Sequence, residues 1–150
     1  MAHKHPGEAV FREFLISIVL HNEAVADRLG LQPVDVAATM LLETRGPLAV
    51  GAIAEELGLP SASATRLIDR LEKAGYARRV RGERDRRTIT VELVEGGLDA
   101  YHAACATSRR HVEALALRYG PEQAPLLLDM FARVTDAHRS ATAELRATTP

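Results

Sequence analysis

Residues 61–90 constrain the fold of this chain most strongly, because they join an amphipathic helix to an arginine-rich hairpin. In the helix, apolar residues recur at spacings of three and four, which predicts one buried stripe; they are Ala64, Leu67, Ile68 and Leu71. Residues 76–80 and 88–94 are typical of strands, and the second alternates apolar and polar side chains. Residues 82–85, Gly-Glu-Arg-Asp, supply the turn. The pattern predicts a helix followed by a projecting β-hairpin, or wing.

A second short helix is predicted just upstream, over residues 47–57. Its apolar residues also fall on one face; they are Val50, Ile53, Ala54 and Leu57. Gly58, Leu59 and Pro60 then break the chain, since glycine suits the end of a helix and proline the start of the next. Two helices joined by a tight glycine-containing turn form a helix-turn-helix. Together with the wing, these residues predict a winged helix-turn-helix.

Positive charge is concentrated in residues 61–90. This window holds nine basic and four acidic residues, a net charge of +5, whereas the whole chain of 150 residues has a formal net charge of −1. A basic patch on an otherwise acidic body is typical of a protein that neutralises phosphates with one face. A solvated charged hairpin is the alternative interpretation. The exposed helix with small hydroxyl residues near its N-terminus favours double-stranded DNA, because such a helix can enter the major groove.

Residues 51–97 resemble the winged-helix core of the MarR family of transcriptional regulators. The motifs that carry the resemblance are A-E-E-L-G-L from Ala54, R-L-I-D-R-L-E from Arg66, and the wing signature D-x-R at Asp85 and Arg87. The resemblance implies a homodimer that binds a pseudo-palindromic operator, usually as a repressor. In many members of the family a small ligand releases the DNA.

The resemblance also implies two sets of DNA-binding residues. It places Arg87 in the minor groove, where the negative potential attracts arginine, with Asp85 orienting the wing arginines by ion pairing. The expected wing set is Arg84, Asp85, Arg86 and Arg87. The expected set on the recognition helix is Ser61, Ser63, Thr65, Arg66 and Arg70. Helix capping is the alternative role for Ser61, Ser63 and Thr65. Phosphate contacts are further expectations for Arg78 and Arg79.

The helical flanks predict dimerisation. One lobe reads one half-site, so a palindromic operator needs two lobes about one helical turn apart. Residues 6–29, 97–119 and 122–146 have helical apolar stripes that are buried more easily between two subunits than within one. We therefore expect a mainly α chain with a small β-hairpin, divided into an N-terminal dimerisation helix (1–31), a DNA-binding lobe (32–95) and C-terminal dimerisation helices (96–150).

The resemblance further implies a ligand pocket between the helical region and the lobe. Its candidate residues are Phe14, Ile18, His21, Met40, Thr44 and Tyr101. Core or interface packing is the alternative role for each of them. A mainly aliphatic lining favours an apolar or aromatic ligand over a phosphorylated one.

Metal and oxidant sensing, which occur in the family, have less support from the residues. His102 and His111 are nine positions apart, which is not the spacing of two ligands on one helix face. A mixed zinc site at His21, His102 or His111 with a carboxylate is the alternative. The single Cys105 lies among alanines and is typical of a helix-packing residue. We therefore expect no metal and no cofactor.

Other protein classes are disfavoured. The chain has no glycine-rich phosphate loop and no G-x-S-x-G motif, so we do not expect an enzyme. A winged helix that binds proteins is the alternative function, although such a module needs no arginine-rich wing. No apolar run approaches 18 residues and the N-terminus lacks a hydrophobic signal core, so we expect a cytoplasmic protein without a membrane partner.

Overall fold

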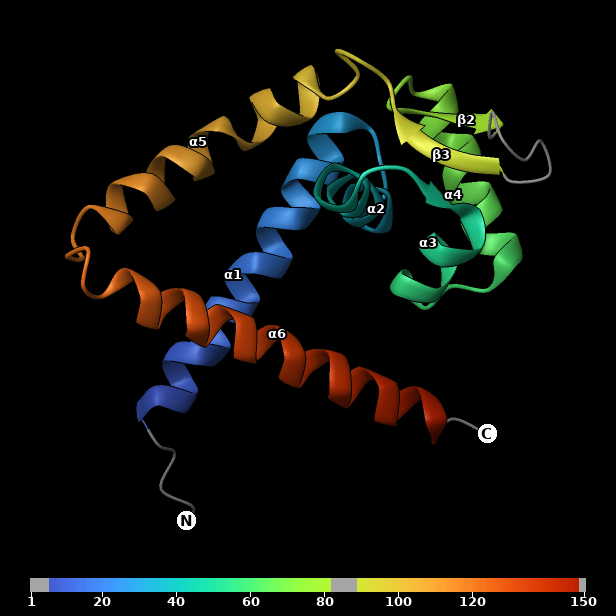
Figure 1. Ribbon diagram of the computed structural model, residues 1–150. Helices are drawn as coiled ribbons and strands as arrows, with labels where there is room; N and C mark the ends of the chain where they lie inside the picture. The colour runs from blue at the N-terminus through green and yellow to red at the C-terminus, as the bar shows by residue number, and fades with distance from the viewer. Residues whose placement is uncertain (1–5, 82–88, 149–150) are drawn as a thin grey trace. The chain divides into compact units, whose positions relative to one another are not determined.

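The computed structural model describes residues 6–81 and 89–148 (Figure 1). The chain divides into two compact units, which meet in sequence between Ala106 and Thr107. The elements, in order, are α1 (Pro6–Leu29), α2 (Pro33–Arg45), β1 (Leu48–Ala49), α3 (Val50–Leu57), α4 (Ser61–Lys73), β2 (Ala77–Arg81), β3 (Ile89–Leu93), α5 (Asp99–Ala116) and α6 (Ala124–Ala147). The predicted fold class, mainly helical with a small β-hairpin, is confirmed.

The sheet contains one strand more than the predicted hairpin. Its order is β1-β3-β2, and both pairings are antiparallel. The helix predicted over residues 47–57 therefore begins too early: Leu48 and Ala49 pair with Val91 and Thr90, and α3 starts at Val50. The backbone groups of β1 find their partners in a strand that lies far along the chain, so tertiary pairing overrides the local helical pattern.

The predicted apolar stripe of α4 forms the centre of the core. Ala64, Leu67, Ile68 and Leu71 are all fully buried. They belong to a core that also contains Ile53 of α3 and Val91 of β3. The C-terminal part of α1 joins the same core through Val25 and Ala26. The recognition helix predicted from the sequence is thus fixed on one side by packing, which leaves its other side available.

The turn between α3 and α4 depends on Gly58. Its backbone is left-handed, with φ 63° and ψ 39°, a conformation that costs other residues free energy. The N–H of Leu59 donates to the carbonyl oxygen of Ala54 at 2.8 Å, which closes the end of α3. Pro60 then precedes the first residue of α4. The predicted helix-turn-helix is therefore present with the expected glycine at its turn.

The second unit holds the last part of α5 and all of α6. Residues of α6 are exposed or half-buried, and none is buried. Its exposed residues include large apolar side chains, such as Leu126 at 70%, Leu128 at 69% and Phe131 at 52%. In a single chain, this unit leaves much of its apolar surface open to solvent. Among the described residues, no helix combines the length and the apolar character that a membrane span needs.

Candidate nucleic-acid interface

The N-terminal part of α4 presents small polar side chains to solvent. Ser61, Thr65 and Arg66 are exposed, and Ser63 is half-buried. Pro60 is the N-cap of α4 and Ser61 is the first helical residue, so Ser61 does not cap this helix. The Thr65 hydroxyl donates to the Ser61 carbonyl oxygen at 3.0 Å. This end of the helix carries hydroxyl groups without bulky side chains, as a helix entering the major groove requires.

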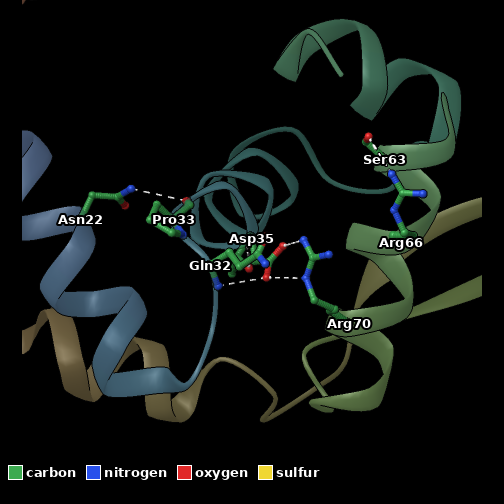
Figure 2. A network of polar contacts seen from close by, with 8 residues as sticks. Asn22, Gln32, Pro33, Asp35, Ser63, Arg66 and Arg70 are labelled. Carbon is green, nitrogen blue, oxygen red and sulfur yellow. Dashed lines mark hydrogen bonds and ion pairs between the residues drawn. The ribbon is translucent and has the colours of Figure 1, made fainter. Parts of the chain in front are cut away.

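Arg66 lies one turn further along the same exposed face. Its Nη2 donates to Oγ of Ser63 at 3.2 Å, an interaction within the helix that Figure 2 shows. The guanidinium has donors beyond the one that this hydrogen bond uses. Arg66 can therefore reach a base edge or a phosphate without breaking an ion pair among the described residues.

Arg70 has a different environment, because it forms a bidentate ion pair with Asp35 of α2 (Figure 2). Nε donates to Oδ2 at 3.0 Å and Nη2 donates to Oδ1 at 2.5 Å. Asp35 is fully buried, whereas the side chain of Arg70 remains 37% exposed. The hydrogen bonds from the guanidinium to Asp35 raise the pKa of Arg70 above its ordinary value. The pair joins the recognition helix to the start of α2.

Asp35 also organises the N-terminus of α2. The backbone N–H of Gln32 donates to Oδ2 of Asp35 at 3.1 Å, as part of a capping box that includes the Gln32 side chain. Nδ2 of Asn22 in α1 donates to the carbonyl oxygen of Pro33 at 3.4 Å. One buried carboxylate thus accepts hydrogen bonds both from its own helix start and from α4.

The side of α4 that faces β2 carries ion pairs of its own. Nη1 of Arg79 lies 2.8 Å from Oδ1 of Asp69 and also pairs with Glu72, whose Oε1 accepts the backbone N–H of Arg79 at 2.7 Å. Burial lowers the pKa of Arg79, but its hydrogen bonds and proximity to the two carboxylates outweigh this effect and raise it. On the hairpin, Arg78 donates to Glu92, the residue directly opposite on β3, at 2.8 Å. These strand arginines therefore meet carboxylates of the same chain.

Comparison with known proteins identifies this arrangement. Residues 32–89, which hold α2, β1, α3, α4 and β2, match the MarR family. This segment is a MarR-family domain. YcgE of Bacillus subtilis, described as an uncharacterized HTH-type transcriptional regulator, is 39% identical over 82 residues, which cover 55% of this chain and 53% of YcgE. The chain spans about half the length of the curated relatives it matches.

Solved structures share the fold over most of the chain. A MarR family protein from Bacillus stearothermophilus superposes with a TM-score of 0.69 at 19% identity, covering 88% of this chain and 92% of that one. The structure of NadR in complex with 4-hydroxyphenylacetate gives a TM-score of 0.65 at 19% identity, covering 89% and 95%. At these identities the likeness establishes the fold.

The predicted wing residues of the MarR-family domain lie outside the described residues. These are Arg84, Asp85, Arg86 and Arg87, in the segment between β2 and β3. Their contacts with the minor groove remain a prediction. The strands on either side are in place, with Arg81 paired opposite Ile89 at the last described position of the hairpin.

The six residues predicted to line a ligand pocket have different environments. Tyr101 is buried in the core, whereas Phe14, Ile18 and Met40 are exposed. His21 and Thr44 are also exposed, and the Thr44 hydroxyl donates to the carbonyl oxygen of Met40. Only Tyr101 of this set is therefore enclosed by the single chain, and the pocket remains a prediction.

The candidates for metal or redox sensing are dispersed. No group of three or more potential metal ligands occurs in residues 6–81 and 89–148. Nε2 of His102 in α5 lies 2.7 Å from Oε1 of Glu43 in α2. Cys105 is half-buried and packs against the core. These side chains link α5 to the domain.

Asp35 is the site residue that sequence reasoning missed. A partial signal is present, because Gln32 and Asp35 have the spacing of a capping box around Pro33 at the helix start. That signal predicts the cap of α2. The partner Arg70 is 35 positions away, so local spacing does not indicate the second use of the carboxylate.

Proposed function

We propose that this protein is a sequence-specific DNA-binding transcriptional regulator that binds a pseudo-palindromic operator as a homodimer and represses transcription. The exposed, hydroxyl-rich N-terminal end of α4 in a MarR-family domain carries the proposal. Ser61, Ser63, Thr65 and Arg66 would meet base edges or phosphates in the major groove. The wing arginines 84, 86 and 87, with Asp85, would bind next to it. No catalytic role is proposed, and a regulator of this kind would act in the cytoplasm, where it meets the chromosome.

Dimerisation is proposed for the helices that flank the domain. The first two thirds of α1 expose large apolar side chains; they are Val10, Phe11, Phe14, Ile16, Ile18, Val19 and Leu20. The second unit exposes another set, among them Val112, Leu115, Leu117 and Phe131. Large contiguous apolar patches on a protein surface mark interaction sites. A second copy of the chain offers the same surfaces, and a two-fold arrangement would bury both sets.

Release by a small apolar or aromatic ligand is the proposed regulation. NadR, which shares the fold, has been solved in complex with 4-hydroxyphenylacetate, an aromatic molecule. In this chain, Phe14, Ile18, His21, Met40, Thr44 and Tyr101 are the proposed lining. A ligand would release DNA only if it binds the DNA-incompetent conformation more tightly than the DNA-competent one.

The test is a selection of genomic duplexes by the purified protein over a range of salt concentrations, followed by sequencing of the retained DNA. We expect a pseudo-palindrome with half-sites about one helical turn apart, and an affinity that falls steeply with salt. Arg87→Ala is expected to weaken binding to that duplex while the protein stays dimeric. Retention without a common motif would contradict a sequence-specific regulator. Failure to retain any duplex would favour a protein-interaction module.

A further inference from the structure

The exposed face of α4 has two edges of different charge. Along the first edge, Arg66, Arg70 and Lys73 follow one another at spacings of four and three residues, which places them on one side of the helix. We call this the α2 edge, because Arg70 pairs with Asp35 of α2. The second edge holds Asp69 and Glu72, and we call it the β2 edge, because both residues pair with Arg79 of β2.

The charges of the two edges differ in sign. On the β2 edge, two carboxylates meet the single guanidinium of Arg79, which leaves a net negative charge. The α2 edge has three cationic side chains and one carboxylate, that of Asp35, which pairs with Arg70, so its net charge is positive. Phosphates are attracted to a positive surface and repelled by a negative one. Among the described residues of α4, the α2 edge is therefore the side suited to a DNA strand.

The surface beside the α2 edge is concave. A shallow depression of about 480 Å³ is bordered by Gly30, Gln32, Arg70 and Lys73, among others. A second, of about 320 Å³, is bordered by Gln32, Ser63, Arg66 and Arg70, among others. Both share Arg70, with Lys73 beside one and Arg66 beside the other. The helix axis rises by about 10 Å from Arg66 to Lys73, so the three cationic side chains are spread over about two turns of α4.

Asp35 fixes Arg70 at the middle of this row. Its two oxygens accept Nε–H and one Nη2 hydrogen, so the plane of the guanidinium is set by two parallel hydrogen bonds. The guanidinium has five N–H donors, and the ion pair uses two of them. The remaining donors belong to a side chain that is still 37% exposed. An arginine ordered before binding loses less conformational entropy when it meets a phosphate.

We infer that Asp35 is a positioning residue for DNA binding, which holds Arg70 so that Arg66, Arg70 and Lys73 meet the phosphates of one strand along the α2 edge. The inference rests on the proposed DNA-binding function. It adds Lys73 to the expected DNA-binding residues, and it assigns to Asp35 a role that its charge alone would not suggest. Removal of an acidic residue from a DNA-binding surface ordinarily strengthens binding, because it removes repulsion of the phosphates. Here the opposite is expected.

The test compares the salt dependence of DNA binding by Asp35→Asn, Lys73→Gln, Arg66→Gln and the full-length parent protein. The probe is a fluorescently labelled duplex recovered in the genomic selection, and binding is measured by anisotropy over a range of salt concentrations. Arg12→Gln is the matched control, because it removes one exposed, ion-paired arginine from α1. Thermal unfolding and sedimentation confirm that each variant is folded and has the parent's oligomeric state.

We expect Lys73→Gln and Arg66→Gln each to reduce the slope of log K against log salt by about 0.9 for each phosphate that the variant no longer neutralises, or twice that when two lobes bind. Asp35→Asn should weaken binding severalfold at low salt and reduce the slope by a similar amount, although it makes the protein more positive. Arg12→Gln should leave the slope unchanged. Adding Arg70→Gln to Asp35→Asn should reduce the slope no further, because both changes remove the same interaction with phosphate.

Several results would overturn the inference. Stronger binding by Asp35→Asn, or an unchanged slope in that variant, would show that Asp35 does not position Arg70 for phosphate. If Asp35→Asn does not fold, the two variants of exposed residues decide, and unchanged slopes for Lys73→Gln and Arg66→Gln would exclude the strand from the α2 edge. If the parent protein binds the duplex and the variants bind it in the same way, the inference is refuted but the proposed function is not. Parent protein that binds no duplex refutes the proposed function as well.

Discussion

Replacement of Arg70 by methionine is expected to destabilise the folded protein through the carboxylate that it leaves behind. Asp35 is fully buried and accepts two hydrogen bonds from Arg70 and one from the backbone N–H of Gln32. Methionine keeps much of the apolar stem that arginine packs against its neighbours, so the change removes mainly the guanidinium. Among the described residues, the carboxylate then keeps only the hydrogen bond from the backbone N–H of Gln32.

The expected decrease follows from the burial of the two partners. Removal of one partner from a fully buried ion pair costs about 3–5 kcal/mol, because the other charge remains buried without compensation. The side chain of Arg70 is 37% exposed, so water can reach the carboxylate once the guanidinium is gone. We therefore expect a free energy of unfolding lower by about 2–3 kcal/mol. Single domains are stable by about 5–15 kcal/mol in total, so this decrease is large enough to measure.

The assay is urea unfolding followed by circular dichroism at one fixed protein concentration, since association with a second copy would make the midpoint depend on concentration. The control is Arg45→Met, because Arg45 pairs with Glu56 at side-chain exposures of 35% and 37%. That change should cost at most about 1 kcal/mol. In the double variant, Asp35→Asn should recover part of the stability lost in Arg70→Met, because it neutralises the unpaired carboxylate. Equal decreases for Arg70→Met and Arg45→Met would refute the reasoning.

Three further predictions concern the turn, the core and the single thiol. Gly58→Ala should lower the free energy of unfolding by about 1 kcal/mol, because Gly58 has φ 63°, whereas Gly51→Ala within α3 should raise it by about 0.5 kcal/mol. Urea unfolding midpoints compare the two variants, and changes of the same sign would contradict the assignment of the turn. Leu67→Ala should cost about 3 kcal/mol, because Leu67 is fully buried and its removal leaves a cavity; a cost under about 1 kcal/mol would mean that the core collapses around it. Cys105, half-buried against the core, should react with a thiol reagent much faster in urea than in the native protein, and fast, complete labelling of the native protein would refute a packing role.

The parts of the fold that could be predicted from the sequence are those that local periodicity specifies. The stripe of α4 and the break at Gly58 are visible within a short window of sequence, and both are present in the structure. The strand β1 was missed because its two residues take their hydrogen bonds from Val91 and Thr90. No signal next to Leu48 indicates a partner so far along the chain, and the neighbouring apolar pattern favours helix.

The same distinction applies to the candidate site. Exposure of Ser61, Thr65 and Arg66 follows from the position of the buried stripe, so the sequence could identify that end of α4. Arg70 lies at the rim of the same face, and its position on the helix is as predicted. The environment of Arg70 could not be predicted, because the partner carboxylate comes from the first turn of α2. The spacing of a helix specifies which side chains share a face, but it contains no information about what another helix brings to that face.

This difference changes how the net charge of residues 61–90 should be interpreted. The value of +5 counts Arg70 and Arg78 but not the carboxylates that pair with them, because Asp35 and Glu92 lie outside residues 61–90. The two carboxylates of α4 that pair with Arg79 lie within the window and are already included in this value. On α4, Arg66 and Lys73 add cationic charge to that of Arg70, and Asp35 sets the orientation of the Arg70 guanidinium. A surface of this kind meets few phosphates per lobe along the helix, so the position of each cationic group, rather than the total positive charge, would set how tightly the helix is held in the groove.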